Sequence, residues 1–168
     1  MNTKSPGDVV KIFYTNADSI VNKINLLKAH VLESSPDLIA ITESWTHKDI
    51  LKSDLNIPGY ELVDRCDRTD TKLGRGGGVL LYSNLSNVTV NEEFKTTFHQ
   101  HIAVKMSNKG EPDLHIHVVY RSPNSTYESN DALLGYMENL PENVVLIGDF
   151  NLPEIDWTSG HQLWGRQL

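Results

Sequence analysis

The first 42 residues carry the pattern that most restricts how this chain folds. A β-branched and aromatic run from Val9 to Tyr14 predicts a strand. Between Ala17 and Ser35, apolar residues recur at helical spacing, with Asp18 or Ser19 available as the cap. Asp37 to Thr42 then predicts a second, buried strand. A strand, a helix and a strand within about 30 residues form a βαβ unit, whose strands are parallel and joined by a right-handed crossover.

The middle of the chain changes to short β-like runs at hairpin spacing. These runs are Tyr60 to Arg65, Gly78 to Ser83, Asn87 to Phe94, His101 to Met106 and Leu114 to Tyr120. A helical pattern returns from Ser125 to Leu140 and leads into the apolar run Val144 to Ile147, which we expect to be a strand buried on both faces. This order predicts an α/β (α+β) domain with a mixed sheet, or two stacked sheets, flanked by helices.

Composition restricts the compartment and the partners. A chain of 168 residues is long enough for one domain with its own core. Cys66 is the only cysteine, which excludes an internal disulfide and favours a reducing compartment. The sequence shows no signal peptide and no apolar run long enough for a transmembrane helix. We therefore predict an intracellular protein, in the nucleus or cytoplasm, that is not secreted and has no membrane partner.

The net charge of −7 gives no general basic character, so DNA binding would depend on a local basic patch or on bridging metal ions. The densest basic patch contains Arg65, Arg68, Lys72 and Arg75. This loop either contacts the DNA backbone or is merely solvated. The glycines around Arg75 do not form a nucleotide phosphate loop, because no Gly-Lys-Ser/Thr follows and a strand comes next; a tight turn with close backbone packing explains them better.

Polar side chains follow three predicted strands where each strand ends: Asn16, Glu43, and Asp149 with Asn151. Each has a simple structural explanation, as a helix cap, a surface acid or an Asx-type turn. If the strands share one sheet region, however, these side chains converge at one rim. Carboxylate and amide oxygens suit a hard cation such as Mg²⁺, which keeps several waters and takes one or two carboxylates. Together they indicate a site that binds metal and orients a phosphodiester.

Two histidine pairs have strand spacing, His99 with His101 and His115 with His117. Such pairs can jointly bind a transition metal, or they can face solvent from a strand. The second explanation is favoured.

Five short blocks of sequence resemble, in order, the endonuclease/exonuclease/phosphatase superfamily. The blocks are Thr15-Asn16-Ala17, Ile41-Thr42-Glu43-Ser44-Trp45, Gly76-Gly77-Gly78-Val79, Tyr120-Arg121-Ser122-Pro123-Asn124 and Gly148-Asp149-Phe150-Asn151-Leu152-Pro153. More narrowly, the chain resembles the apurinic-type endonuclease domain of non-LTR retrotransposons. The resemblance spans residues 8–158, with residues 1–7 and 159–168 as tails. It implies a four-layer sandwich of two packed mixed β-sheets flanked by helices, with the active site at one edge of the sheets.

The resemblance also implies roles for individual residues. Glu43 would bind Mg²⁺ or Mn²⁺, with Asn16 and Asp149 at the metal. Asp149 would position or deprotonate the attacking water. Asn151 would stabilise the pentacovalent phosphate, and Tyr120 would lie beside it. The protein's contribution is then positioning and charge neutralisation.

Three further residues are expected to bind the substrate or support the site: Asn124, Arg121 and Arg75. The implied substrate is DNA, and the implied partner is a reverse transcriptase domain encoded downstream. The implied reaction nicks one DNA strand and leaves a 3′-hydroxyl that primes reverse transcription. No nucleotide cofactor is implied.

One departure from the family pattern limits this expectation. Family members complete the site with a late Ser-Asp-His segment, whereas this chain ends 17 residues after Asn151 and contains no such segment. His161 is not preceded by aspartate, and we do not expect it to replace the missing histidine. We therefore expect little or no cleavage by this chain and a sheet that lacks its C-terminal strands. The alternatives are a non-catalytic remnant that binds nucleic acid or protein, and a phosphatase or phospholipid diesterase of the same fold.

Overall fold

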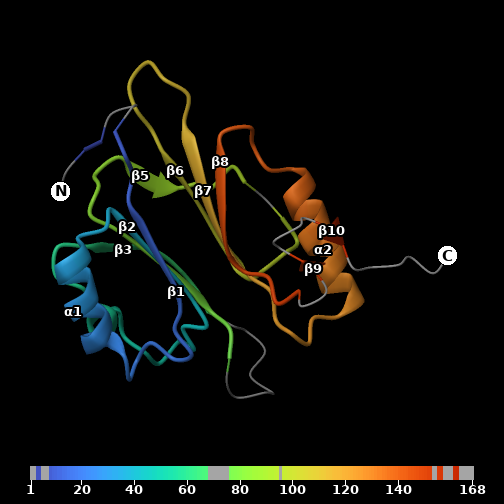
Figure 1. Ribbon diagram of the computed structural model, residues 1–168, viewed down its shortest axis with the longest axis horizontal. Coiled ribbons are helices and arrows are strands. Elements are labelled where there is room, and N and C mark those ends of the chain that lie inside the picture. Colours follow the sequence, from blue (N-terminus) through green and yellow to red (C-terminus); the bar gives the residue numbers. More distant parts are fainter. Residues whose placement is uncertain are drawn as a thin grey trace.

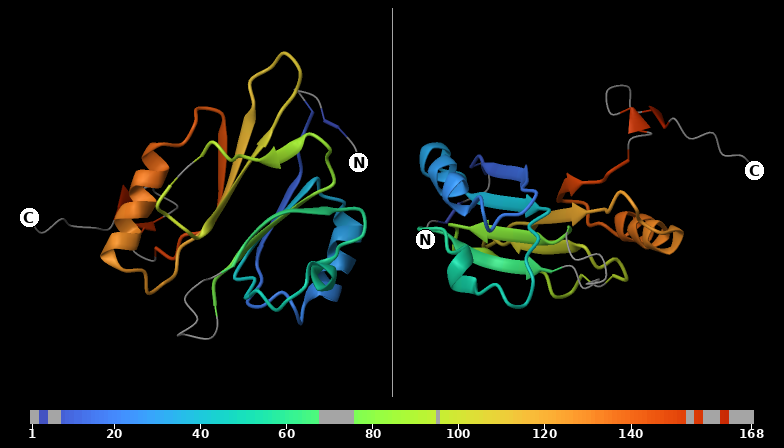
Figure 2. Two further views of the ribbon diagram at one scale, coloured as in Figure 1. Left: turned by 180° about the vertical axis from the view of Figure 1, so that it is seen from behind. Right: turned by 90° about the horizontal axis from the view of Figure 1, so that it is seen from below.

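Two four-stranded sheets pack face to face, and one helix covers the outer face of each (Figure 1). The computed structural model describes residues 3–4, 8–67, 76–94, 96–152, 155–156 and 161–162. The predicted four-layer sandwich of two mixed sheets is confirmed. Views from behind and from below show the two helices on opposite outer sides of the paired sheets (Figure 2).

The first sheet has the order β1 (Ile12–Asn16), β2 (Leu38–Thr42), β4 (Val79–Ser83), β3 (Glu61–Cys66). β1 and β2 are parallel, and the other pairs are antiparallel. Helix α1 (Ile24–Ser34) connects the parallel pair, as the βαβ pattern predicted. The 3-10 turn η1 (Lys52–Leu55) lies between β2 and β3.

The second sheet also has one parallel pair of strands at an edge, but this pair comes last along the chain instead of first. Its strands are β5 (Val88–Val90), β6 (His101–Met106), β7 (Leu114–Tyr120) and β8 (Val144–Asp149). β7 and β8 are parallel and are connected by helix α2 (Tyr127–Glu138), which Thr126 caps by accepting a hydrogen bond from the amide of Ser129. Beyond it, β9 (Ile155–Asp156) pairs antiparallel with β10 (His161–Gln162). In the parts of the chain that the structure describes, no helix is long and apolar enough to cross a membrane.

The core has three parts that follow the alternation of side chains along the strands. Leu38 and Ala40 of β2 face the second sheet and pack in the cluster between the sheets. Ile39 and Ile41 point the other way and pack with Leu27 of α1. All five residues of β2 are therefore buried, which explains its continuous apolar sequence. A third cluster, including Leu133 and Tyr136, lies between α2 and the second sheet.

The first helix starts later than its sequence pattern predicted. It begins at Ile24, with Lys23 as a cap residue that makes no side-chain hydrogen bond. The expected caps, Asp18 and Ser19, have positive φ angles of 43° and 73°. The amide of Ser19 donates to the carbonyl of Glu43 at 2.9 Å, and the amide of Ile20 to that of Ser44 at 3.1 Å. This segment is therefore tied to the end of β2 and cannot form a helical turn.

The prediction that the Val144 to Ile147 strand is buried on both faces is wrong. Every residue of β8 is only partly buried, because β8 is an edge strand in the sheet order. Gly148 lies inside this strand, opposite Val119 of β7. A Cβ added to Gly148 would lie 1.9 Å from the carbonyl oxygen of Val119, so the absence of a side chain allows β8 to approach β7.

Candidate active site

The carboxyl ends of β1, β2, β7 and β8 meet at one edge of the two sheets. Asn16 ends β1, and its Nδ2 donates a 2.7 Å hydrogen bond to Oδ2 of Asp149, which ends β8. The two residues are 133 positions apart and belong to different sheets. Asp149 neighbours Tyr120 across the β7–β8 ladder, and Asn16 neighbours Thr42, the residue before Glu43. Asn16 and Asp149 therefore lie close to Glu43 and Tyr120.

Glu43 is held by three hydrogen-bond donors. Its Oε2 accepts from Nε1 of Trp45 and from the amide of Gly77, both at 2.7 Å. Its Oε1 accepts from the hydroxyl of Tyr120. Glu43 and Trp45 have φ angles of 51° and 55°, a conformation that non-glycine residues rarely adopt. The carboxylate therefore has a fixed orientation, and Oε1 retains a lone pair for a cation.

The glycine-rich run supports this loop. The amides of Ser44 and Trp45 donate to the carbonyls of Gly78 and Gly77, at 3.2 and 2.9 Å. A Cβ on Gly78 would lie 2.4 Å from Oγ of Ser44, and its φ is +88°. Close backbone packing, as the sequence predicted, explains these glycines.

Asp149 is fixed through both carboxylate oxygens. Oδ2 accepts from Asn16, and Oδ1 accepts from the amide of Asn151 at 3.1 Å, which closes an Asx-type turn. Asn151 has a φ of 46°, and its Nδ2 donates to the carbonyl of Arg121 at 2.7 Å. The Asx-type turn that the sequence offered as a purely structural explanation is therefore present. The same turn orients the Asp149 carboxylate toward Asn16 of the other sheet.

Arg121 is buried, at 9% exposure, and its guanidinium is used internally. Nε donates to Oδ1 of Asn130 at 2.8 Å, and Nη1 donates to the carbonyl of Asn151 at 2.6 Å. Arg121 thereby joins α2 to the loop after β8. Asn124 is exposed in the turn before α2. Arg75 lies outside the described residues. The substrate-binding roles of these three residues stay predictions.

A cleft of about 850 Å³ opens beside Asp149. It lies between the edge strands β1 and β8, and its lining includes Asn16, Asp149, Asn151 and Arg121. Tyr14 also lines it and was not predicted, although it precedes Asn16 by two positions and therefore shares its side of β1. Burial raises the pKa of the Tyr14 hydroxyl; the hydrogen bond to Thr42 opposes this rise, and the nearby Asp149 adds to it.

The donor set fits a hard cation. Among the described residues, no group of three or more His, Cys, Asp or Glu side chains is arranged to hold a metal ion. Mg²⁺, however, needs only one or two carboxylates, because water and substrate oxygens supply its other ligands. Glu43 and Asp149 offer these carboxylates at the same edge of the sandwich.

The histidine pairs do not face solvent as expected. His117 is fully buried beneath α2, and its Nδ1 lies 2.6 Å from the hydroxyl of Tyr136. His115 contacts Asn91, and His101 packs against the ring of Tyr136. Only His99, which precedes β6, is exposed. The solvent-facing prediction is therefore wrong for three of the four histidines. They are covered by α2 and by the loop between β5 and β6, which the spacing of residues in the sequence does not reveal.

The basic patch is also partly reassigned. Arg65 lies in β3, and its guanidinium forms an ion pair with Asp67 at 2.7 Å. It is therefore not free for DNA. Arg68, Lys72 and Arg75 lie outside the described residues.

Comparisons with known proteins agree with this architecture. Solved structures with the same fold include the 3′ phosphatase NExo from Neisseria bound to a product DNA hairpin, with 18% identity and a TM-score of 0.62 over 88% of this chain and 60% of that one. An AP endonuclease from Archaeoglobus fulgidus has 18% identity and a TM-score of 0.62 over 87% and 59%. The endonuclease domain of TRAS1, a telomere-specific non-LTR retrotransposon, has 13% identity and a TM-score of 0.54 over 84% and 60%.

This chain thus spans about 60% of the length of these structures. A comparison with curated protein sequences finds no match. The model of the Endonuclease/Exonuclease/phosphatase family matches residues 13–164, nearly the whole chain. The chain belongs to the Endonuclease/Exonuclease/phosphatase family.

Proposed function

We propose that this chain carries the metal-binding and water-positioning part of a Mg²⁺-dependent DNA endonuclease of the non-LTR retrotransposon type. The observation that carries the proposal is the Asn16–Asp149 hydrogen bond next to the Glu43–Tyr120 pair. The reaction nicks target DNA and leaves a 3′-hydroxyl that primes a reverse transcriptase. We expect this activity in the nucleus or cytoplasm.

Glu43, Asp149 and Asn151 would each have a different role in this reaction. Glu43 would hold the Mg²⁺ or Mn²⁺ ion, which neutralises charge on the scissile phosphate when bound. Asp149 would orient or deprotonate the attacking water, and Asn16 keeps that carboxylate directed to the cleft through its 2.7 Å hydrogen bond. The Asn151 amide has a second N–H besides the one bonded to Arg121, and this N–H is the donor for a phosphate oxygen.

Cleavage by these 168 residues alone is expected to be weak. The sequence contains no Asp-His dipeptide, which the family resemblance implies as the source of a general-acid/base histidine. Incubating supercoiled plasmid with the purified chain and Mg²⁺ tests this expectation. Nicking that disappears in Asp149→Ala would show that the chain is competent without that histidine.

Mn²⁺ binding tests the metal site itself. Binding is measured as the decrease in the paramagnetic resonance signal of the free ion. We expect binding that is lost in Glu43→Gln and weakened in Asp149→Asn. Glu61→Gln is the matched control, because Glu61 is exposed at the far end of β3. Absence of Mn²⁺ binding, or equal loss in the control, would contradict the proposed site.

Three other functions would give different results with the same purified chain. A phosphatase, as in the Neisseria structure of the same fold, would release phosphate from a 3′-phosphorylated oligonucleotide without nicking a plasmid. A non-catalytic remnant would bind DNA in a salt-sensitive manner without turnover. A phospholipid diesterase would act on vesicles and leave DNA intact.

A further inference from the structure

Behind Glu43, a row of buried polar side chains runs away from the site. Ser44 and Thr46 are 0% and 3% exposed, although both lie in a loop. Oγ of Ser44 lies 3.0 Å from Oγ1 of Thr46, and Oγ1 of Thr46 donates to Oδ1 of Asp67 at 2.6 Å. Buried hydroxyls are costly unless they are hydrogen-bonded, so this row fixes the loop in one conformation.

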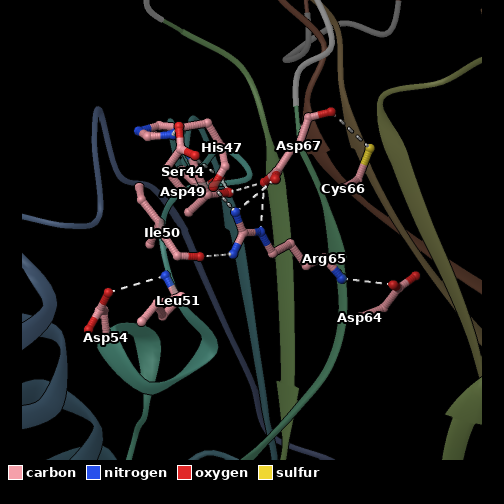
Figure 3. Close-up of polar contacts among 11 residues, drawn as sticks. Ser44, His47, Asp49, Ile50, Leu51, Asp54, Asp64, Arg65, Cys66 and Asp67 are labelled. Carbon is pink, nitrogen blue, oxygen red and sulfur yellow. Dashed lines mark hydrogen bonds and ion pairs between the residues drawn. The ribbon is translucent and has the colours of Figure 1, made fainter.

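The row ends in a two-point ion pair between Arg65 of β3 and Asp67, which follows β3 (Figure 3). Nε and Nη2 of Arg65 donate to the two carboxylate oxygens of Asp67 at 2.8 and 2.7 Å. Their side chains are only 19% and 27% exposed. Burial alone would raise the pKa of Asp67, but hydrogen bonds from Arg65 and Thr46 outweigh it and lower the pKa, which keeps the carboxylate ionised.

The same guanidinium holds the chain that follows the Glu43 loop. Nη1 of Arg65 donates to the carbonyl of Ile50 at 2.7 Å, and Nη2 donates to the carbonyl of His47. Figure 3 shows the Arg65 side chain extending from β3 toward these carbonyls. A lysine could not reproduce this contact, because its single ammonium lacks the planar fork.

Trp45 connects this network to Glu43. It lies between Ser44 and Thr46 in sequence, and its indole N–H donates to Oε2 of Glu43. Trp45 and Glu43 both have left-handed backbone conformations. Such conformations persist only where the surrounding structure enforces them. A shift of Thr46 would therefore displace Trp45 and remove one donor from Glu43.

We propose that Arg65, Asp67 and Thr46 are positioning residues that set the orientation of the Glu43 carboxylate for metal binding. The inference rests on the proposed function in one respect, namely that Glu43 binds the metal. None of the three contacts the cleft or a reacting group. They act through Trp45, and we call them the positioning relay.

The test compares Thr46→Val with Thr46→Ser, since only serine keeps the hydroxyl that donates to Asp67. Asp67→Asn removes the charge at the other end of the relay. Asp113→Asn is the matched control, because Asp113 pairs with Lys105 at 3.9 Å in the hairpin between β6 and β7. Two quantities are measured in the full chain: the Trp45 indole N–H resonance without metal, assigned with Trp45→Phe, and the dissociation constant for Mn²⁺.

We expect Thr46→Val and Asp67→Asn to move the Trp45 resonance and to weaken Mn²⁺ binding about tenfold, the low end of the range for partners that orient a metal ligand. Thr46→Ser and Asp113→Asn should resemble the unmodified chain. An unmoved resonance, or a moved resonance with unchanged Mn²⁺ affinity, would overturn the inference. If the resonance moves but no protein binds Mn²⁺, the relay orients Glu43 and the proposed metal function fails instead. Should Asp67→Asn not fold, the Thr46 pair decides the question.

Discussion

Replacing Gly148 with alanine should separate β8 from β7 and displace the adjoining catalytic candidate. An added Cβ would lie 1.9 Å from the carbonyl oxygen of Val119, whereas real Cβ contacts are essentially never shorter than 3.0 Å. The strands must therefore move apart by more than 1 Å at this point. Asp149 is the next residue, so its 2.7 Å hydrogen bond to Asn16 should break or lengthen.

The loss of stability has two sources. Gly148 has a φ of +151°, where alanine is strained by about 1–3 kcal/mol. Forcing a methyl group into a filled space costs about 1–3 kcal/mol more. We expect a total of about 2–6 kcal/mol, which a urea slope of about 2 kcal/mol/M converts into a midpoint lower by about 1–3 M.

Urea unfolding followed by circular dichroism measures this change. Gly135→Ala is the control, since a Cβ at Gly135 in the middle of α2 meets nothing within 4 Å. That substitution should raise stability by about 0.5–1 kcal/mol through helix propensity. Equal midpoints for Gly148→Ala and the unmodified chain would refute the steric argument, as would a Gly135→Ala protein destabilised to the same extent.

Three further predictions concern the buried polar groups. Burial, together with His115 and His101, lowers the pKa of His117 to about 4. Because the unfolded chain then binds the proton more readily, the free energy of unfolding should fall as pH drops from about 6.5 to about 4, by about 2 kcal/mol at pH 5. Urea unfolding of His117→Gln should show a smaller loss of stability between pH 7 and pH 5 than the unmodified chain. Tyr136→Phe leaves Nδ1 of His117 without its partner and should cost about 1–3 kcal/mol in urea unfolding at pH 7; no change would contradict the hydrogen bond. Arg121→Lys should lower the melting temperature by about 4–8 °C for a loss of about 2 kcal/mol, because lysine cannot reach both Asn130 and the Asn151 carbonyl; an unchanged melting temperature would argue against this bracing role.

The sequence predicts the fold well where the pattern is local. The first βαβ unit follows from periodicity, as do α2 and β8 as separate elements, and β6 and β7 have the predicted bounds. That β7 and β8 are parallel, which makes a second βαβ unit, was not predicted. Pairing is not local, so sequence alone did not reveal that β8 is an edge strand or that β4 joins β2 and β3. The start of α1 was missed because backbone bonds to the end of β2 override helix propensity at Asp18 and Ser19.

The placement of the candidate site residues could be predicted where they stand at strand ends, while their roles stay predictions. Asn16, Glu43 and Asp149 end or follow parallel strands, and such strands finish at a common edge. The contacts of Arg65 could not be predicted, because its position among other basic residues in the sequence was equally consistent with a loop that contacts DNA. Its true neighbours, Asp67 and the carbonyls of His47 and Ile50, are assembled only by the folded backbone. Tyr14 was missed because one aromatic residue in a strand carries no functional signal.

The hydrogen bond from Asn16 to Asp149 spans the seam between the two sheets. It can form only while the two sheets are packed together, so its length reports how well the two sheets are aligned. A conservative change deep in the interior, such as Val104→Ala in the cluster between the sheets, would let one sheet shift on the other and lengthen the Asn16–Asp149 hydrogen bond without touching either residue. The geometry of the proposed site therefore depends on the packing between the sheets as well as on the residues at the edge.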